Sequence, residues 1–167
     1  APGLHDPATT PSYVPRASAR PSEPLQPLPT PQGLLPARVE LGRRLFHEPR
    51  LSRDGSVSCA SCHDLSRGGT DRLPRSRGVG GAEGDLNAPT VLNSGLNLAQ
   101  FWDGRAATLE EQVDGPLLSP KEMGSTWPAA LGALAADGTY VSAFRHAYRE
   151  GITPDTVRDA IAAFERS

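Results

Sequence analysis

Five consecutive residues, Cys59-Ala60-Ser61-Cys62-His63, constrain the fold of this chain more than any other stretch. Two thiols three positions apart on one helical turn can each add to one vinyl group of a haem, and the imidazole that follows then lies against the iron as an axial ligand. The pattern predicts one covalent haem c held by Cys59 and Cys62, with His63 on the iron. Such a chain must form a cavity for a large, flat, apolar body.

Two other interpretations of these cysteines are weaker. They are the only cysteines in the chain, so they could form a disulfide or a thioredoxin-like redox pair. A redox pair needs no histidine directly after the second cysteine, and it usually lies beside a βαβ pattern, which this sequence lacks. A structural zinc site needs a second pair of ligands, and no Cys/His pair follows at a usable spacing.

The composition and the first residues of the sequence limit which partners and which cellular compartment we expect. The net charge of -2 gives no reason to expect nucleic acid, and no apolar run is long enough to cross a bilayer. The sequence begins Ala1-Pro2-Gly3, which we interpret as a mature form whose export signal has been removed. Because haem c is attached outside the cytoplasmic membrane, we expect a periplasmic or otherwise exported protein.

The chain divides into a proline-rich arm and one helical domain. More than half of the seventeen prolines lie in residues 1–33, where we expect an extended arm without helix or sheet hydrogen bonds. Apolar residues at helical spacing and flanking cap residues predict helices over 36–48, 108–118, 127–136, 140–149 and from 154 onward. No alternating strand pattern of useful length appears, so the fold class is all-α, with long loops around the haem.

Several motifs in residues 34–167 occur in an order that resembles a known family. They are Leu41-Gly42-Arg43-Arg44-Leu45-Phe46, Pro49-Arg50-Leu51-Ser52, Ser58 to His63, Gly68-Gly69-Thr70-Asp71, Asn87-Ala88-Pro89-Thr90, Phe101-Trp102-Asp103-Gly104-Arg105-Ala106, Glu111-Gln112, Gly115-Pro116 and Glu122-Met123-Gly124. This region is similar to the N-terminal, peroxidatic domain of the bacterial di-haem cytochrome c peroxidases and their MauG-type relatives. The resemblance implies a cytochrome c-like, mono-haem domain over 34–167.

The resemblance also implies roles for single residues. Glu122 matches the family's distal acid-base carboxylate and Gln112 its distal hydrogen-bonding amide. Trp102 matches the tryptophan between the two haems, and Asn87 an asparagine that contributes to calcium binding at the domain boundary. These roles suit the chemistry, because splitting the peroxide O–O bond needs a group that moves a proton and a neutral group that orients the substrate.

Three departures from the family pattern bear on function. The loop Ser76-Arg77-Gly78-Val79-Gly80 carries valine where the family commonly has a histidine that caps the resting iron, so the iron is expected to be open unless another ligand replaces it. The second haem motif of the family does not occur in this sequence. The calcium site normally draws further ligands from that second domain, which makes calcium at Asn87 doubtful.

Two classes of function follow. The first is a peroxidase-type haem domain that reduces hydrogen peroxide or a related oxidant with electrons from a redox partner or a second haem subunit. The second is a non-enzymatic electron carrier in which a sixth ligand closes the iron, with Met123 the first candidate and His146, His47 and His5 less favoured. A sensor or assembly subunit with a structural haem is a third possibility.

Overall fold

The computed structural model describes residues 26–167, and the chain separates into two units, one up to Thr30 and one from Pro31 to Ser167. Residues 26–30 are exposed and carry no helix or strand. Most of the expected proline-rich arm, and with it His5, therefore lies outside the described residues. Everything below concerns the second unit.

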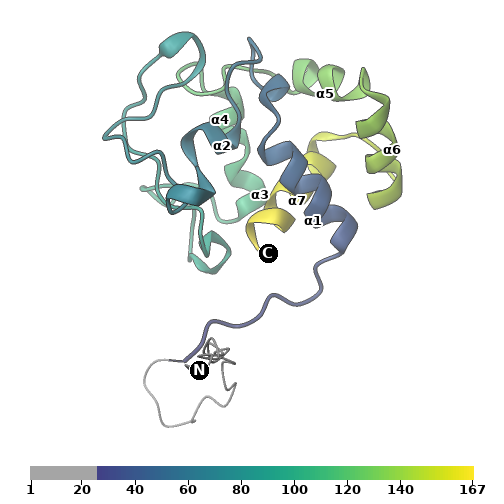
Figure 1. The fold of residues 1–167 in the computed structure, drawn as a ribbon, viewed down its shortest axis with the longest axis horizontal. Coiled ribbons are helices and arrows are strands. Elements are labelled where there is room, and N and C mark those ends of the chain that lie inside the picture. Colours follow the sequence, from purple (N-terminus) through teal and green to yellow (C-terminus); the bar gives the residue numbers. More distant parts are fainter. Residues whose placement is uncertain (1–25) are drawn as a thin grey trace, which may run out of the picture. The chain divides into compact units, whose positions relative to one another are not determined.

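The second unit is helical, which confirms the all-α prediction. Its helices are α1 (Pro36–Phe46), α2 (Cys59–Cys62), α3 (Leu109–Gln112), α4 (Asp114–Leu118), α5 (Trp127–Ala135), α6 (Gly138–Ala147) and α7 (Pro154–Glu165), shown in Figure 1. Short 3₁₀ turns, η1 (Pro49–Leu51), η2 (Leu65–Arg67), η3 (Val79–Gly81) and η4 (Ser94–Leu96), punctuate the loops. Between residues 26 and 167 the β pairing is limited to two isolated bridges, Arg77–Glu83 and Gln100–Ala106.

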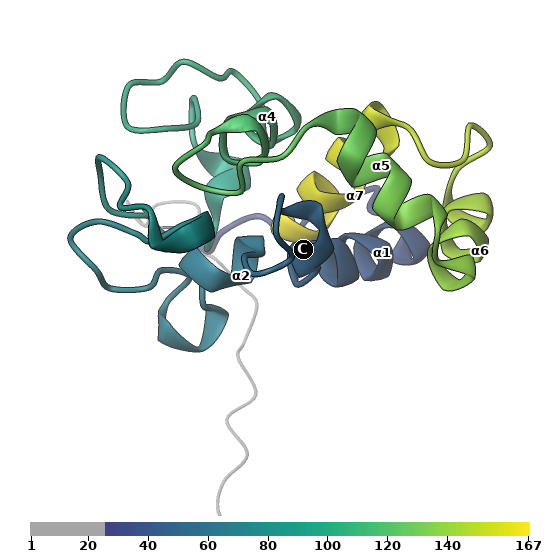
Figure 2. The same cartoon turned by 90° about the horizontal axis from the view of Figure 1, so that it is seen from above.

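The centre of the domain is the packing of α1 against α7, which lie side by side in Figures 1 and 2. The helices approach so closely at Gly42 that a Cβ there would overlap the carbonyl of Ala160. Their facing apolar side chains are buried: Leu41, Leu45, Phe46, Val157, Ala160 and Ile161. The helices α5 and α6 lie on one side of this pair, and α2, α4 and the long loops lie on the other (Figure 2).

Helix ends follow the predicted cap chemistry, with small shifts. Thr153 accepts a hydrogen bond from the Thr156 amide at the start of α7, and Pro154 occupies the first turn. The helix expected over 108–118 is two short helices, α3 and α4. Thr108 accepts a hydrogen bond from the Glu111 amide at 3.2 Å and caps α3, and the Glu111 carboxylate accepts one from the Ala107 amide at 2.8 Å. The predicted span was right and its continuity was wrong.

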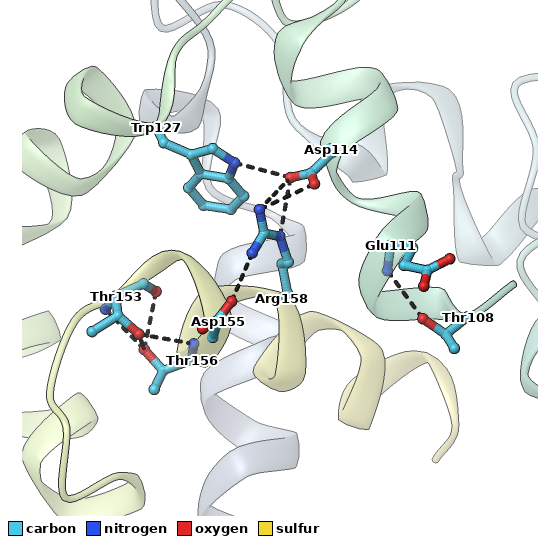
Figure 3. A network of polar contacts seen from close by, with 8 residues as sticks. All are labelled: Thr108, Glu111, Asp114, Trp127, Thr153, Asp155, Thr156 and Arg158. Atoms are coloured by element: carbon cyan, nitrogen blue, oxygen red, sulfur yellow. Dashed lines mark hydrogen bonds and ion pairs between the residues drawn. The ribbon is translucent and has the colours of Figure 1, made fainter. Parts of the chain in front are cut away.

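A polar network ties three helices together beside the core (Figure 3). Arg158 of α7 donates two hydrogen bonds to the Asp114 carboxylate of α4, both at 3.0 Å, and one to Asp155 at 2.7 Å. The Trp127 indole of α5 donates to the same Asp114 at 2.9 Å, and the Arg158 guanidinium lies 4.7 Å from its ring centroid. This cluster fixes α4, α5 and α7 relative to one another. No helix within residues 26–167 is long and apolar enough to span a membrane.

Candidate haem-binding site

A cavity of about 530 Å³ opens beside α2, and both cysteines and His63 line it. The helices α3, α4 and α7, together with the loops over 76–102, form the rest of the wall. Its apolar lining includes Leu51, Val57, Leu109, Val113, Leu117, Val157 and Ile161. Two thiols, one imidazole and an apolar wall around one cavity are the donor set and shape that a covalent haem requires. The residues present therefore fit haem c.

The two cysteines are placed by a short capped helix. The Ser58 amide donates to the Ser61 hydroxyl at 3.0 Å, which holds the first turn of α2 and brings both thiols to the cavity. Both thiols are free. Burial raises the pKa of Cys59 to about 12 and also raises the pKa of Cys62. A redox pair needs a thiol with a lowered pKa, so these values disfavour the thioredoxin-like alternative.

His63 is held in the orientation that an iron ligand needs. Its Nδ1 lies 3.2 Å from the carbonyl oxygen of Gly69, so Nδ1–H donates to that carbonyl and Nε2 remains for the metal. Burial lowers the pKa of His63, which favours the neutral imidazole that binds metals. The sequence predicted the ligand but not the carbonyl that orients it.

Two loop motifs meet to position that carbonyl. Gly69 also accepts the Val91 amide at 3.2 Å, while Thr90 Oγ1 donates to Gly68 at 2.7 Å and Thr70 Oγ1 to Ala88 at 3.0 Å. Gly69 has a φ of +71°, which favours glycine, and a side chain there would press on Thr90 and Val91. The motifs around Gly68-Gly69 and Asn87–Thr90 thus act as one support for His63.

The expected distal residues lie on the same cavity. Gln112, at the end of α3, and Glu122, in the turn after α4, both line it. The Glu122 amide donates to the Ser119 carbonyl at 3.0 Å, which sets the turn. Burial raises the pKa of Glu122, against the lowering effect of the Arg105 charge. A carboxyl and a neutral amide therefore face the space that a haem would fill.

Val79 does not face that space. Its side chain is 2% exposed and belongs to the hydrophobic core, while its amide donates to the Glu122 carbonyl at 2.8 Å. A Cβ at Gly78 would overlap the carbonyl oxygens of Lys121 and Glu122, so glycine permits this close approach. The loop that carries a histidine in the family is packed here against the backbone of the predicted acid-base residue.

Trp102 and Asn87 lie together at the exposed part of the cavity wall. The Trp102 side chain is 62% exposed, and its indole N–H donates to the backbone carbonyl of Asn87 at 3.1 Å. Phe101 adopts a φ of +68°, and its ring occupies the place that a side chain at Gly115 would need. Within residues 26–167 no group of three or more His, Cys, Asp or Glu residues could hold a metal ion.

Three of the four candidates for a sixth iron ligand lie within residues 26–167, and of these three Met123 lines the cavity. Met123 is 4% exposed and lines the cavity beside Glu122. His47 is exposed at the C-terminus of α1, where its ring lies 2.9 Å from the Arg43 carbonyl, and His146 is exposed on the last turn of α6. Neither histidine lines the cavity.

Among the polar residues of the wall that sequence reasoning missed are Ser76, Ser94 and Glu165. A signal for Glu165 was present, because it stands four and eight residues after Ile161 and Val157 on the apolar stripe of α7. The hydroxyls of Ser76 and Ser94 are buried and lack hydrogen-bond partners among the described residues.

Comparison with known proteins identifies the family. The model of the di-haem cytochrome c peroxidase family matches residues 36–167. The chain belongs to this family. It is 47% identical over 147 residues to the cytochrome c peroxidase Ccp of Escherichia coli, covering 87% of this chain and 32% of the relative. It is 48% identical over 149 residues to the cytochrome c551 peroxidase of Nitrosomonas europaea, covering 87% and 44%.

MauG-type members of the family are similar as well. MauG of Methylorubrum extorquens is 41% identical over 143 residues, covering 84% of this chain and 40% of the relative. Among solved structures, a MauG-like protein associated with microbial copper homeostasis superposes with a TM-score of 0.74 at 33% identity, covering 90% of this chain and 45% of that one. The chain thus spans less than half the length of these family members, and it carries one Cys-x-x-Cys-His motif.

Proposed function

We propose that this chain is the peroxidatic haem domain of a hydrogen peroxide reductase. The observation that carries the proposal is the shared cavity: Glu122 and Gln112 face the same space as Cys59, Cys62 and His63. The likeness to proteins named cytochrome c peroxidase supports it. The overall reaction consumes one peroxide, two electrons and two protons and yields two waters, with the electrons supplied by a redox partner or a second haem subunit.

Each residue has a defined task in this proposal. A bound haem would supply an iron that accepts peroxide oxygen and exchanges electrons. Cys59 and Cys62 would hold the porphyrin, and His63, oriented by its hydrogen bond to the Gly69 carbonyl, would bind the iron. Glu122 accepts a proton from one peroxide oxygen and returns it to the other, and burial raises the pKa of this carboxyl, which strengthens it as a proton acceptor. Gln112 orients peroxide without taking its proton.

The side facing Glu122 is proposed to be open to substrate. Val79 has no ligating atom and lies in the core, so the loop does not close the iron. The hydrogen bond from the Val79 amide to the Glu122 carbonyl also holds Glu122 in position before peroxide binds. Such a site needs no displacement of a histidine before peroxide enters.

Electrons are proposed to enter at Trp102. The exposed indole lies on the cavity wall, so a partner that covers it would come close to the haem edge. We propose one haem c per chain and an exported location, where haem c is attached. A calcium ion at Asn87 would need ligands from a further domain or subunit, because within residues 26–167 no cluster of acidic, histidine or cysteine ligands surrounds it.

The test is the variant Glu122→Gln in the haem-loaded chain. The isosteric amide cannot move the proton, so peroxide turnover should fall by roughly 10²-fold or more, while the spectrum of the ferric haem stays nearly unchanged. Glu83→Gln, an exposed carboxylate of the neighbouring loop, is the control and should keep full turnover. Turnover unchanged in Glu122→Gln would remove the acid-base role.

One observation favours the second function, an electron carrier. Met123 lines the cavity and is buried, so its thioether is available to a haem iron. In that case Met123→Leu, which keeps the side-chain volume, should convert a low-spin ferric spectrum to high spin. A wild-type chain that is high spin and reacts rapidly with peroxide would exclude the carrier.

A further inference from the structure

Glu165 is a carboxylate on the apolar face of a helix that lines the haem cavity. It is the last residue of α7 and follows Val157 and Ile161 at intervals of four residues, and all three line the cavity. The apolar periodicity of α7 predicts an apolar side chain at position 165, and the chain has a glutamate there instead. Glu165 is half-buried, and a carboxyl that is ionised without a cation partner is costly in a mostly apolar wall, so its presence requires a reason.

The nearest cation does not neutralise Glu165. Arg166 is bound to Glu110 of α3 through two hydrogen bonds of 2.6 and 2.9 Å, a bidentate pair that clamps α7 to α3. The other charged groups of α1 and α3 are engaged elsewhere: Arg38 pairs with Asp159, Arg43 pairs with Glu40, Arg44 donates to Thr139 at 3.1 Å, and Glu111 accepts from the Ala107 amide at 2.8 Å. On α1, the His47 ring faces Phe164. Among residues 26–167, Glu165 therefore has no ion-pair partner.

Ser94 is the polar neighbour of Glu165. It is a buried residue of η4 that lines the cavity, and its backbone carbonyl accepts the Gln100 amide at 3.0 Å. Its hydroxyl oxygen is buried and has no hydrogen-bond partner within residues 26–167, and the hydroxyl lowers the pKa of Glu165. The pair thus forms a polar spot in an otherwise apolar section of wall.

The surroundings of this spot bring the pKa of the Glu165 carboxyl close to neutral pH. Burial raises the pKa of Glu165 to about 7, and the negative charge of Glu110 acts in the same direction. The Ser94 hydroxyl and Arg166 act in the opposite direction without cancelling the effect of burial. Glu165 and Cys59 line the same cavity, and the charge of Glu165 raises the pKa of the Cys59 thiol.

We propose that Glu165 is a proton site coupled to the oxidation state of the haem: its carboxylate takes up one proton from solvent when the iron accepts one electron from the donor, and releases that proton when the electron leaves. The inference rests on the proposed function only in requiring a haem in this cavity. Reduction removes one positive charge from the cavity, so a half-buried carboxylate in the cavity wall becomes more favourable in its neutral form. By linkage, protonation of Glu165 must favour the reduced iron by the same free energy.

The sign of the pH dependence follows. Below the range in which Glu165 titrates, the carboxyl is neutral in both oxidation states and the midpoint potential is high and constant. As the pH rises through that range, the oxidised protein loses the proton first, because its pKa is the lower of the two. The potential therefore falls until both states are ionised, and then becomes constant at a lower value.

The test is a spectroelectrochemical titration of the haem-loaded chain between pH 5.5 and 8.5. We expect the wild-type potential to fall across this range and the Glu165→Gln potential to stay constant near the high wild-type value. Glu83→Gln, which removes an exposed carboxylate that does not line the cavity, is the control and should retain the fall. A wild-type potential that does not change with pH, or a fall that survives in Glu165→Gln, would overturn the proposal.

A second measurement does not depend on the potential. The infrared difference spectrum of reduced minus oxidised protein should gain a carboxylic acid C=O band, and Glu165→Gln should lack it. No such band in the wild-type chain would contradict proton uptake at Glu165. Failure of the peroxidase proposal would appear separately, as a ferric haem that does not react with peroxide, and would leave both of these measurements interpretable.

Discussion

The amide N–H of Val79 donates a hydrogen bond to the carbonyl oxygen of Glu122 at 2.8 Å. This contact joins the loop before η3 to the residue proposed to move protons, across more than forty residues of sequence. It depends on Gly78, because any side chain there would overlap the carbonyls of Lys121 and Glu122. The position of Glu122, the proposed acid-base residue, is thus coupled to the path of this loop.

Gly78→Ala should separate this loop from Glu122. The added methyl has to displace backbone atoms, so we expect a loss of roughly 1–3 kcal/mol in the free energy of unfolding and a fall in peroxide turnover larger than the stability loss alone explains. Denaturant unfolding and steady-state turnover measure the two effects. Gly80→Asn is the control in the same loop, because nothing crowds that position and asparagine tolerates its φ of +64°. Equal turnover in both variants would contradict the coupling.

Substitution by alanine should change the free energy of unfolding in opposite directions at two helical glycines. At Gly42 of α1 a Cβ would overlap the Ala160 carbonyl of α7, so Gly42→Ala should destabilise the chain by about 1–3 kcal/mol. At Gly132 of α5 nothing lies within 4 Å of the added Cβ, so Gly132→Ala should stabilise it by about 0.5–1 kcal/mol. Thermal unfolding of the two variants decides this, and a Gly42→Ala chain as stable as wild type would refute the close packing of α1 on α7.

Substitution of Trp102 should slow haem reduction, whereas substitution of Trp127 should lower the free energy of unfolding. Trp102 is exposed and makes one hydrogen bond to Asn87, so Trp102→Phe should change the free energy of unfolding by about 1 kcal/mol or less while slowing reduction of the haem by an electron donor. Trp127 binds Asp114 and contacts Arg158, so Trp127→Phe should cost about 1–3 kcal/mol and leave the electron transfer rate unchanged. Stopped-flow reduction and denaturant unfolding measure both quantities. Equal reduction rates in wild type and Trp102→Phe would exclude entry at Trp102.

Acid should weaken the junction between η1 and α6. Buried Glu48 accepts two hydrogen bonds from the Arg50 guanidinium, at 2.8 and 2.7 Å, and one from Tyr140 at 2.9 Å, and Arg50 lowers the pKa of Glu48 below its ordinary 4.5. The pKa of Asp137, which Thr139 and Arg50 both bind, is lowered to about 2. Because both pKa values are depressed in the folded chain, this stability is present above the ordinary carboxyl range and is lost as the pH falls through the folded values.

Unfolding measured from pH 7 down to pH 2.5 tests this. Glu48→Gln should lower stability at pH 7 by roughly 1–3 kcal/mol and should flatten the acid loss that the wild type shows. Tyr140→Phe, which removes one hydrogen bond to Glu48 without removing its charge, should keep the acid loss. An acid profile of Glu48→Gln identical to that of the wild type would assign the loss to other carboxylates.

The sequence by itself determined the local chemistry. The spacing of Cys59, Cys62 and His63 places three haem-binding groups on one helical turn, and cap residues such as Thr108 and Thr153 mark helix starts, because these effects act within a few residues of the chain. Helical periodicity and the absence of strand patterns likewise determined the all-α class. The ordered motifs then indicated the family and the distal pair, Gln112 and Glu122.

Tertiary structure decided which distant groups act on one another. The Gly69 carbonyl orients His63 only because the loops around Gly69 and Thr90 meet, and Val79 reaches Glu122 only because glycine lets two backbones touch. The same holds for Glu165, whose environment depends on the engagement of Arg166 by Glu110. Burial and unpaired charge arise from the path of the whole chain, and sequence spacing encodes neither beyond a few helical turns.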